Sequence, residues 1–173
     1  YTVQQIFAAH GLKIYDVETL PTHGGSLRIY ACHYSDPRSV TESVGKAVAD
    51  EIVYGLTKYE TYVSFQKQVE TIRSAFLAFL LQAKEERKTV VGYGAAAKGN
   101  TLLNYCGIKG KQTIAAVADA SPHKQGRYLP GSHIPVISPE KIKELQPDYL
   151  IIFPWNLRGE IIQQNSYIRE WGG

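Results

Sequence analysis

A glycine-rich turn between an apolar strand and a helix constrains the fold more than any other feature of this sequence. Residues 92–97, GYGAAA, follow the β-branched run 89–91 and open a helical pattern that extends to Tyr105. In the pattern G-x-G-x-x-G/A, Gly92 permits a tight turn, Gly94 lets a phosphate approach the backbone, and Ala97 lets helix and sheet pack closely. Exposed N–H groups and the helix dipole favour an anion. We therefore expect this turn to bind an anion or a nucleotide; the alternative is a turn whose glycines serve packing alone.

Apolar strands alternate with helical patterns through the rest of residues 89–173. Strand patterns occupy residues 113–119, 134–137 and 149–153. Helical patterns occupy 138–146, with Ser138 as N-cap, and 157–164, with Asn156 as N-cap. Such alternation is typical of a doubly wound parallel sheet. We therefore predict an α/β fold in which residues 89–173 form a Rossmann-like, mostly parallel sheet with helices on both faces.

Residues 1–88 are predicted to form a hairpin and two helices, an annex that leads into this domain. After a short amino-terminal helix, extended runs at 13–20 and 27–34 are joined by the turn-forming cluster 21–26. Ser39 and Glu42 have the spacing of a capping box at the start of the next helix. The longer helix, 59–87, carries an apolar stripe that we expect to pack on its own domain. The stripe consists of Tyr62, Phe65, Val69, Ile72, Phe76, Phe79 and Ala83.

The composition argues against several classes of function. Lysine and arginine number 19 against 16 acidic residues, an excess too small to indicate a nucleic-acid or membrane partner. Cys32 and Cys106 are too few for a disulfide framework, and no cysteines or histidines have metal-ligand spacing. The longest apolar stretch, 76–81, is too short to span a bilayer. We expect a cytoplasmic location and, because methionine is absent, an internal piece of a longer protein.

Polar side chains gather at the ends of the predicted strands. Lys98 places a positive charge beside the glycine turn, and Asn100 can donate hydrogen bonds. Asp119 ends the second strand, where an acid bonds a ribose hydroxyl in dinucleotide-binding folds; its alternative role is to cap the turn that follows. Pro154 to Asn156 end the last strand, at the edge where open α/β sheets bind ligands. Trp155 there either stacks on a base or packs under the last helix.

Three segments together resemble a known enzyme family: LPTHGGSLR at 20–28, VGYGAAAKGNTLLN at 91–104 and IFPWN at 152–156. The chain resembles the carboxy-terminal domain of the S-adenosylmethionine-dependent sugar C-methyltransferases, which methylate a carbon of a nucleotide-linked keto-deoxysugar. The resemblance implies that the chain is the carboxy-terminal fragment of a larger enzyme, with residues 89–173 as the nucleotide-sugar-binding domain. The residues expected to contact the substrate are Gly92, Gly94, Ala95, Ala96, Lys98, Gly99, Asn100, Asp119, Pro154, Asn156 and His23.

The resemblance also implies where the chemistry lies. S-adenosylmethionine, zinc and the motif that supplies the catalytic base are expected in parts of the parent enzyme outside this sequence. We therefore expect no cofactor, no metal and no catalytic residue in this chain, and no methyltransferase activity from it alone. The expected partners are the nucleotide-sugar and the amino-terminal and S-adenosylmethionine-binding domains of the same polypeptide.

Two other functions fit the same residues. The glycine pattern and Asp119 also suit an NAD-binding oxidoreductase or sensor domain. The apolar stripe from Tyr62 to Ala83 suits a non-catalytic module that dimerises or binds another protein.

Overall fold

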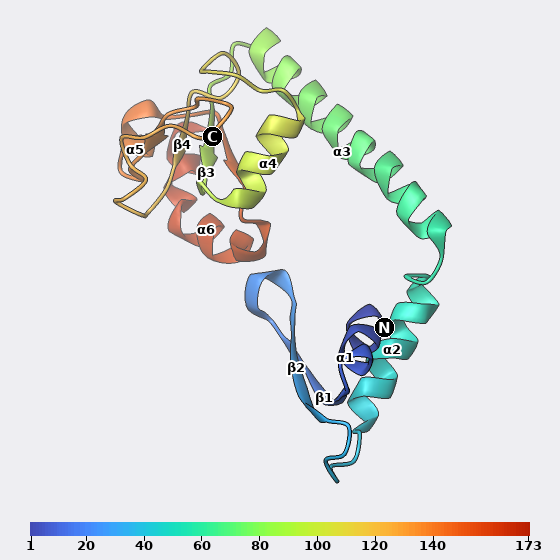
Figure 1. The fold of residues 1–173 in the computed structure, drawn as a ribbon. Coiled ribbons are helices and arrows are strands. Elements are labelled where there is room, and N and C mark those ends of the chain that lie inside the picture. The colour runs from blue at the N-terminus through green and yellow to red at the C-terminus, as the bar shows by residue number, and fades with distance from the viewer. The chain divides into compact units, whose positions relative to one another are not determined.

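The computed structural model describes residues 1–173 and divides into two compact units, Tyr1–Gln68 and Val69–Gly173. We call them the amino-terminal unit and the sheet unit (Figure 1). The division falls within the long helix α3 (Tyr59–Glu85), so the second half of this helix belongs with the sheet. The predicted boundary between residues 88 and 89 lies just before the first strand of the sheet, which begins at Val90.

The amino-terminal unit contains the predicted hairpin. Its strands pair antiparallel from Leu12 opposite His33 to Leu20 opposite Ser26, with a bulge between Ile14 and Asp16. A 3₁₀ turn, η1 (Thr22–Gly24), joins them. The strands are β1 (Leu12–Leu20) and β2 (Ser26–His33). Helix α1 (Thr2–Ala9) precedes the hairpin in the sequence, and helix α2 (Glu42–Tyr54) follows it.

The predicted capping box at Ser39 is wrong. Helix α2 begins at Glu42 after Thr41, and no side chain caps it. The hydroxyls of Thr41 and Ser43 instead donate to Oδ1 of Asp16, each over 2.7 Å. These bonds, with the N–H of Val17, hold the pKa of Asp16 below its usual range, the Ser43 hydroxyl contributing most. Asp16, on the strand β1, thus takes the hydroxyl of Thr41, the residue just before α2, and that of Ser43 in its first turn, which the local sequence of α2 does not reveal.

The sheet unit has the predicted parallel sheet, with strand order β5-β4-β3-β6. Because the chain starts in the middle, adds β4 and β5 on one side and then returns to place β6 on the other, the order reverses between β3 and β6. In such sheets the crevice at the carboxyl ends of these two strands is the usual ligand site. The strands are β3 (Val90–Tyr93), β4 (Ala116–Ala118), β5 (Val136–Ile137) and β6 (Tyr149–Ile152).

Helices cover both faces of this sheet, as predicted. One hydrophobic cluster joins Leu80 of α3 and Leu103 of α4 (Ala97–Tyr105) to the strands. A second cluster joins Ile142 of α5 (Lys141–Leu145) and Ile161 of α6 (Arg158–Gln164) to Val91 and its neighbours. Two separate cores on opposite sides of one sheet are what alternating strands and helices produce when every strand is buried.

The starts of three helices differ from the predictions. The sequence pattern predicted that helix α4 begins at Ala95, whereas it begins two residues later, at Ala97. Ser138 does not cap α5, since it lies in a tight turn in which the N–H of Lys141 bonds to its carbonyl oxygen. Asn156 does not cap α6, because a 3₁₀ turn, η2 (Trp155–Leu157), separates the strand from that helix. The chain ends in a third 3₁₀ segment, η3 (Ser166–Trp171).

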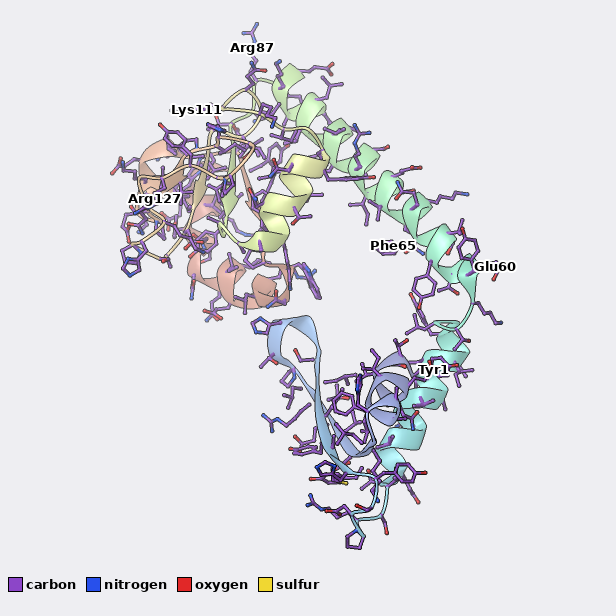
Figure 2. All side chains as sticks on the ribbon, viewed as in Figure 1. Tyr1, Glu60, Phe65, Arg87, Lys111 and Arg127 are labelled. Carbon is purple, nitrogen blue, oxygen red and sulfur yellow. The ribbon has the colours of Figure 1, made fainter.

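The apolar stripe of α3 is covered along half of its length. Phe76 and Phe79 are half-buried, while Leu80 and Ala83 are buried in the core of the sheet unit. Tyr62, Phe65 and Ile72 remain 57%, 63% and 59% exposed, and Phe65 is labelled in Figure 2. Val69 is half-buried outside that core, so the stripe packs into the core of the sheet unit only from Phe76 onward.

A carboxylate just before β6 ties that strand to β3. Asp148 accepts hydrogen bonds from the Lys88 ammonium at 2.9 Å and from the N–H of Thr89 at 2.7 Å. The bond from Lys88 contributes most to lowering the pKa of Asp148, followed by the bond from Thr89. A carboxyl whose pKa is lower in the folded state stabilises the fold above the pKa of the unfolded chain. This contribution is lost as pH falls through the lowered folded-state value.

We predict that Asp148→Asn lowers the urea midpoint of the sheet unit at pH 7. As pH falls, the midpoint of the variant should decrease less than that of the parent. The difference between variant and parent should narrow below about pH 4, where the unfolded-state carboxyl protonates. Urea titrations at pH 7, 5 and 3 measure this. Glu144→Gln, which removes an exposed carboxylate of α5, is the control. A variant curve parallel to that of the parent at every pH would show that this carboxylate does not link the strands.

Candidate ligand-binding site at the β3–β6 edge of the sheet

The loops that follow β3 and β6 touch each other at the carboxyl edge of the sheet. Gly94 has a φ of +90°, and a side chain there would place its Cβ 2.5 Å from Cδ of Pro154. Gly94 is therefore needed both for its backbone conformation and for its contact with Pro154. The loop remains close to the neighbouring strand because no side chain separates them.

The other glycines of the turn pack against one aromatic side chain. A Cβ on Gly92 would lie 2.5 Å from Cε2 of Phe153, and one on Gly99 would lie 2.6 Å from its Cβ. The glycine pattern assigned the close packing of helix and strand to Ala97, but Gly99, two residues further along α4, provides it. Ala97 is exposed.

The N–H groups of the glycine loop are engaged within the protein. Gly94 donates to the carbonyl oxygen of Ala118 over 2.7 Å, and Ala96 donates to that of Gly94 over 2.8 Å. Ala95 donates to the Oδ2 atom of Asp119 over 2.7 Å. The uncapped backbone donors lie one step later: α4 begins at Ala97, and Ala96 at its N-cap supplies no side-chain hydrogen bond. A bound anion would therefore meet the first turn of α4 rather than the glycine loop.

Asp119 is an internal anion with several partners. Its side chain is 11% exposed and accepts from the N–H of Ser121 over 2.9 Å and from the Lys124 ammonium over 3.1 Å. These contacts match the turn-capping role considered for Asp119, and a ribose contact stays a prediction. Sequence reasoning missed Lys124; its signal was a cation five residues after the acid, across a Ser-Pro turn.

Lys98, Trp155 and Asn156 form a cluster at the point where the strand order reverses. The Lys98 ammonium donates to Oδ1 of Asn156 over 3.1 Å and lies 4.9 Å from the centre of the Trp155 ring. Trp155 is 60% exposed, so it does not pack beneath the last helix. An exposed cation, an exposed aromatic ring and an amide are thus held together by segments that follow β3 and β6.

Three further predicted residues lie around this cluster. Ala95, Pro154 and Asn100 are half-buried. The side-chain oxygen of Asn100 is buried without a hydrogen-bond partner, which leaves an acceptor that a ligand donor could satisfy. The predicted donor residue therefore offers an acceptor as well.

An apolar groove that sequence reasoning did not identify adjoins Lys98. It has a volume of about 300 Å³ and lies between α3 and α4, lined by Val69, Ile72, Leu102 and Tyr105 beside Lys98 and Thr101. The sequence did hold a signal for it. Val69 and Ile72 are three residues apart, as are Leu102 and Tyr105, and this spacing places the two members of each pair on the same face of their helix.

His23 belongs to the amino-terminal unit, at the tip of the hairpin. It has a φ of +57°, and Gly24 and Gly25 follow with values of +86° and +124°. The Ser26 hydroxyl donates to the carbonyl oxygen of Thr22 across this tip. Three consecutive residues in the left-handed region make a tight, exposed turn, and the substrate contact of His23 stays a prediction.

The structure contains no assembled metal site. No three side chains of His, Cys, Asp or Glu come close enough together to hold a metal ion. Both cysteines are free thiols, and burial raises the pKa of Cys106 above its usual range. None of the helices combines the length and the hydropathy that a membrane crossing requires.

Comparison with known proteins identifies the family. A family model described as the C-methyltransferase C-terminal domain matches residues 21–173. The chain is also 37% identical over 168 residues to the C-methyltransferase NovU of Streptomyces niveus; the match covers 97% of this chain and 40% of that relative. The chain thus spans less than half the length of the curated relative it matches. The resemblance drawn from the three sequence segments is confirmed, and the chain belongs to the family of C-methyltransferase C-terminal domains.

Proposed function

We propose that the sheet unit binds the nucleotide-sugar substrate of a C-methyltransferase, with its diphosphate at the first turn of α4. The observation that carries this proposal is the cluster of Lys98, Trp155 and Asn156 at the reversal of strand order. Open α/β sheets bind ligands at this edge. The cluster supplies a cation for phosphate, an exposed ring for stacking and an amide for hydrogen bonding.

The charges at the start of α4 suit a diphosphate. An uncapped helix start presents backbone donors and a partial positive charge to the ligand. The Lys98 ammonium is exposed and carries a full positive charge beside the start of α4, which suits a charge-assisted hydrogen bond to a phosphate oxygen. The orphaned acceptor of Asn100 suits a donor such as a sugar hydroxyl.

The contacts of Asp119 favour this ligand over NAD. In a dinucleotide-binding fold, the acid at the end of the second strand is available to the ribose. Here both oxygens of that carboxylate accept hydrogen bonds from the protein, one of them closing the glycine loop through the N–H of Ala95. A dinucleotide in the usual position would have to displace these bonds.

The chemical step would be completed by parts of the enzyme outside this chain. Bound S-adenosylmethionine would supply the methyl group. A base outside this chain would remove the proton next to the ketone, and the enolate carbon would then form the new C–C bond as the S–CH₃ bond breaks. The residues of this chain would position the substrate and orient its reacting carbon. We place the reaction in the cytoplasm, where both free cysteines would stay reduced.

Lys98→Ala should weaken nucleotide-sugar binding roughly tenfold to a hundredfold, the usual range for one charge-assisted hydrogen bond. The loss should shrink at high salt, because Lys98 is exposed and its interaction is screened. Calorimetric titration with a nucleoside-diphosphate sugar measures this. Lys111→Ala, which removes another exposed lysine of the sheet unit, is the matched control (Figure 2). If both variants lost the same amount of affinity, Lys98 would have no specific role in binding.

Ala97→Glu should abolish measurable binding while leaving the fold intact. A carboxylate in the first turn suits the helix dipole but repels a phosphate at the same place. Ala97→Gln, nearly the same shape without the charge, should bind within about threefold of the parent. Gly94→Val is a poorer test, because its side chain would also collide with Pro154. Normal binding by Ala97→Glu would place the phosphate elsewhere.

The isolated chain should discriminate among three ligands. Nucleotide-sugar should bind saturably, whereas S-adenosylmethionine and NAD should not bind at micromolar concentrations, and no methyl transfer should occur. Parallel titrations with the three ligands measure this. Saturable binding of S-adenosylmethionine would contradict the proposed division of labour, and binding of NAD alone would favour the dinucleotide alternative.

A further inference from the structure

The hydrophobic core is divided very unevenly between the two units. In residues 1–68 the buried hydrophobic side chains are Ile14 and Val44, and all the others lie in the sheet unit. A two-stranded hairpin is marginally stable in water until it packs against further apolar surface, and a unit of this size buries little surface of its own. The amino-terminal unit therefore needs apolar contacts that it does not supply itself.

A cavity shows where such contacts are missing. It has a volume of about 150 Å³ and is enclosed by α1, the hairpin, α2 and the start of α3. Both buried side chains, Ile14 and Val44, line it. Its lining also includes four exposed hydrophobic side chains: Tyr1 and Val3 at 40% each, Leu27 at 53% and Tyr62 at 57%. The small core of this unit thus opens directly to its surface.

The size and rim of the cavity fit a side chain of another protein segment. An apolar cavity of roughly this volume can take up an aromatic ring. The exposed apolar side chains around it widen the patch beyond a single buried group, which is typical of a protein interface with one buried anchor. Most of the lining side chains are apolar, and Glu51 is the charged residue among them.

The likeness to a longer enzyme indicates the occupant. The match covers nearly all of this chain but 40% of the relative, so most of that relative lies outside the matched domain. Tyr1 is among the residues that line the cavity.

We propose that the cavity and its rim dock the remainder of a C-methyltransferase polypeptide, which inserts an apolar side chain between α1, the hairpin and α2. The inference rests on the proposed function in one respect, since it takes this chain as one domain of a longer enzyme. It adds the surface through which that domain is held, which the nucleotide-sugar site does not involve.

Hydrogen exchange in the full-length polypeptide tests the proposal. Backbone amides of β1 and β2 should exchange at least about tenfold more slowly there than in the isolated chain, because docking adds stability to the hairpin. Val3→Asp should abolish this difference, since a carboxylate at the rim cannot be buried without a partner. Val53→Asp is the matched control: this helical valine is 88% exposed, does not line the cavity and should leave the difference intact.

Three results would overturn the proposal. The first is that β1 and β2 exchange equally fast in the full-length polypeptide and in the isolated chain. The second is that Val3→Asp and Val53→Asp change this exchange equally. The third is a dimer of the isolated chain that Val3→Asp dissociates, because a second copy would then be the occupant. In the isolated chain both variants should exchange like the parent, which shows that they fold. Nucleotide-sugar titration separates the two proposals: Lys98→Ala should lower affinity without changing exchange, and Val3→Asp should do the reverse.

Discussion

The packing of Phe153 and Pro154 against glycines is the constraint on which the sheet unit depends. Atoms of Phe153 occupy the space that side chains on Gly92 and Gly99 would fill, and Pro154 does the same at Gly94. These contacts bring β3, β6 and the start of α4 together at one edge of the sheet. They fix how far the loop after β3 lies from the loop after β6, and the candidate site is carried by these two segments. A methyl group added at any of the three glycines would force backbone or ring to move, because close-packed interiors have no spare volume.

The distribution of charge around the glycine loop is set by side chains of the fold itself. Asp119 accepts from the N–H of Ala95 and pairs with Lys124, so the loop already holds an anion of the protein itself. The fold shares its strand order and glycine pattern with dinucleotide-binding sheets, but its loop is closed by this carboxylate. A second exposed ammonium, that of Lys98, lies in the first turn of α4, where it contacts Trp155 and Asn156. The same backbone architecture can therefore serve a different ligand, because the electrostatics of a site are set by side chains rather than by topology.

The two units depend on their surroundings in different ways. The sheet unit buries two hydrophobic clusters, one on each face of the sheet. The amino-terminal unit buries Ile14 and Val44 and leaves its small core open through a cavity. Secondary structure is well defined in both, since the hairpin register and helix α2 rest on backbone hydrogen bonds and on the Asp16 network. Hydrogen bonds of this kind specify a conformation, whereas most of the stability of a domain comes from apolar burial.

Local patterns in the sequence determined the elements of this protein and their class. Alternating apolar strands and helices predicted the parallel sheet with helices on both faces. The turn-forming cluster at 21–26 predicted the hairpin, and three short motifs identified the family. These features depend on residues close together in the chain.

Tertiary structure alone decided the rest. The hydroxyls of Thr41 and Ser43 at the start of α2 bond to a carboxylate on a distant strand, and Gly99 rather than Ala97 meets Phe153. Asp119 closes the glycine loop, and the stripe of α3 enters the core of the sheet unit only from Phe76 onward. Each of these outcomes depends on which partner the fold brings within reach, and a sequence pattern records periodicity and propensity but not the distance between remote side chains.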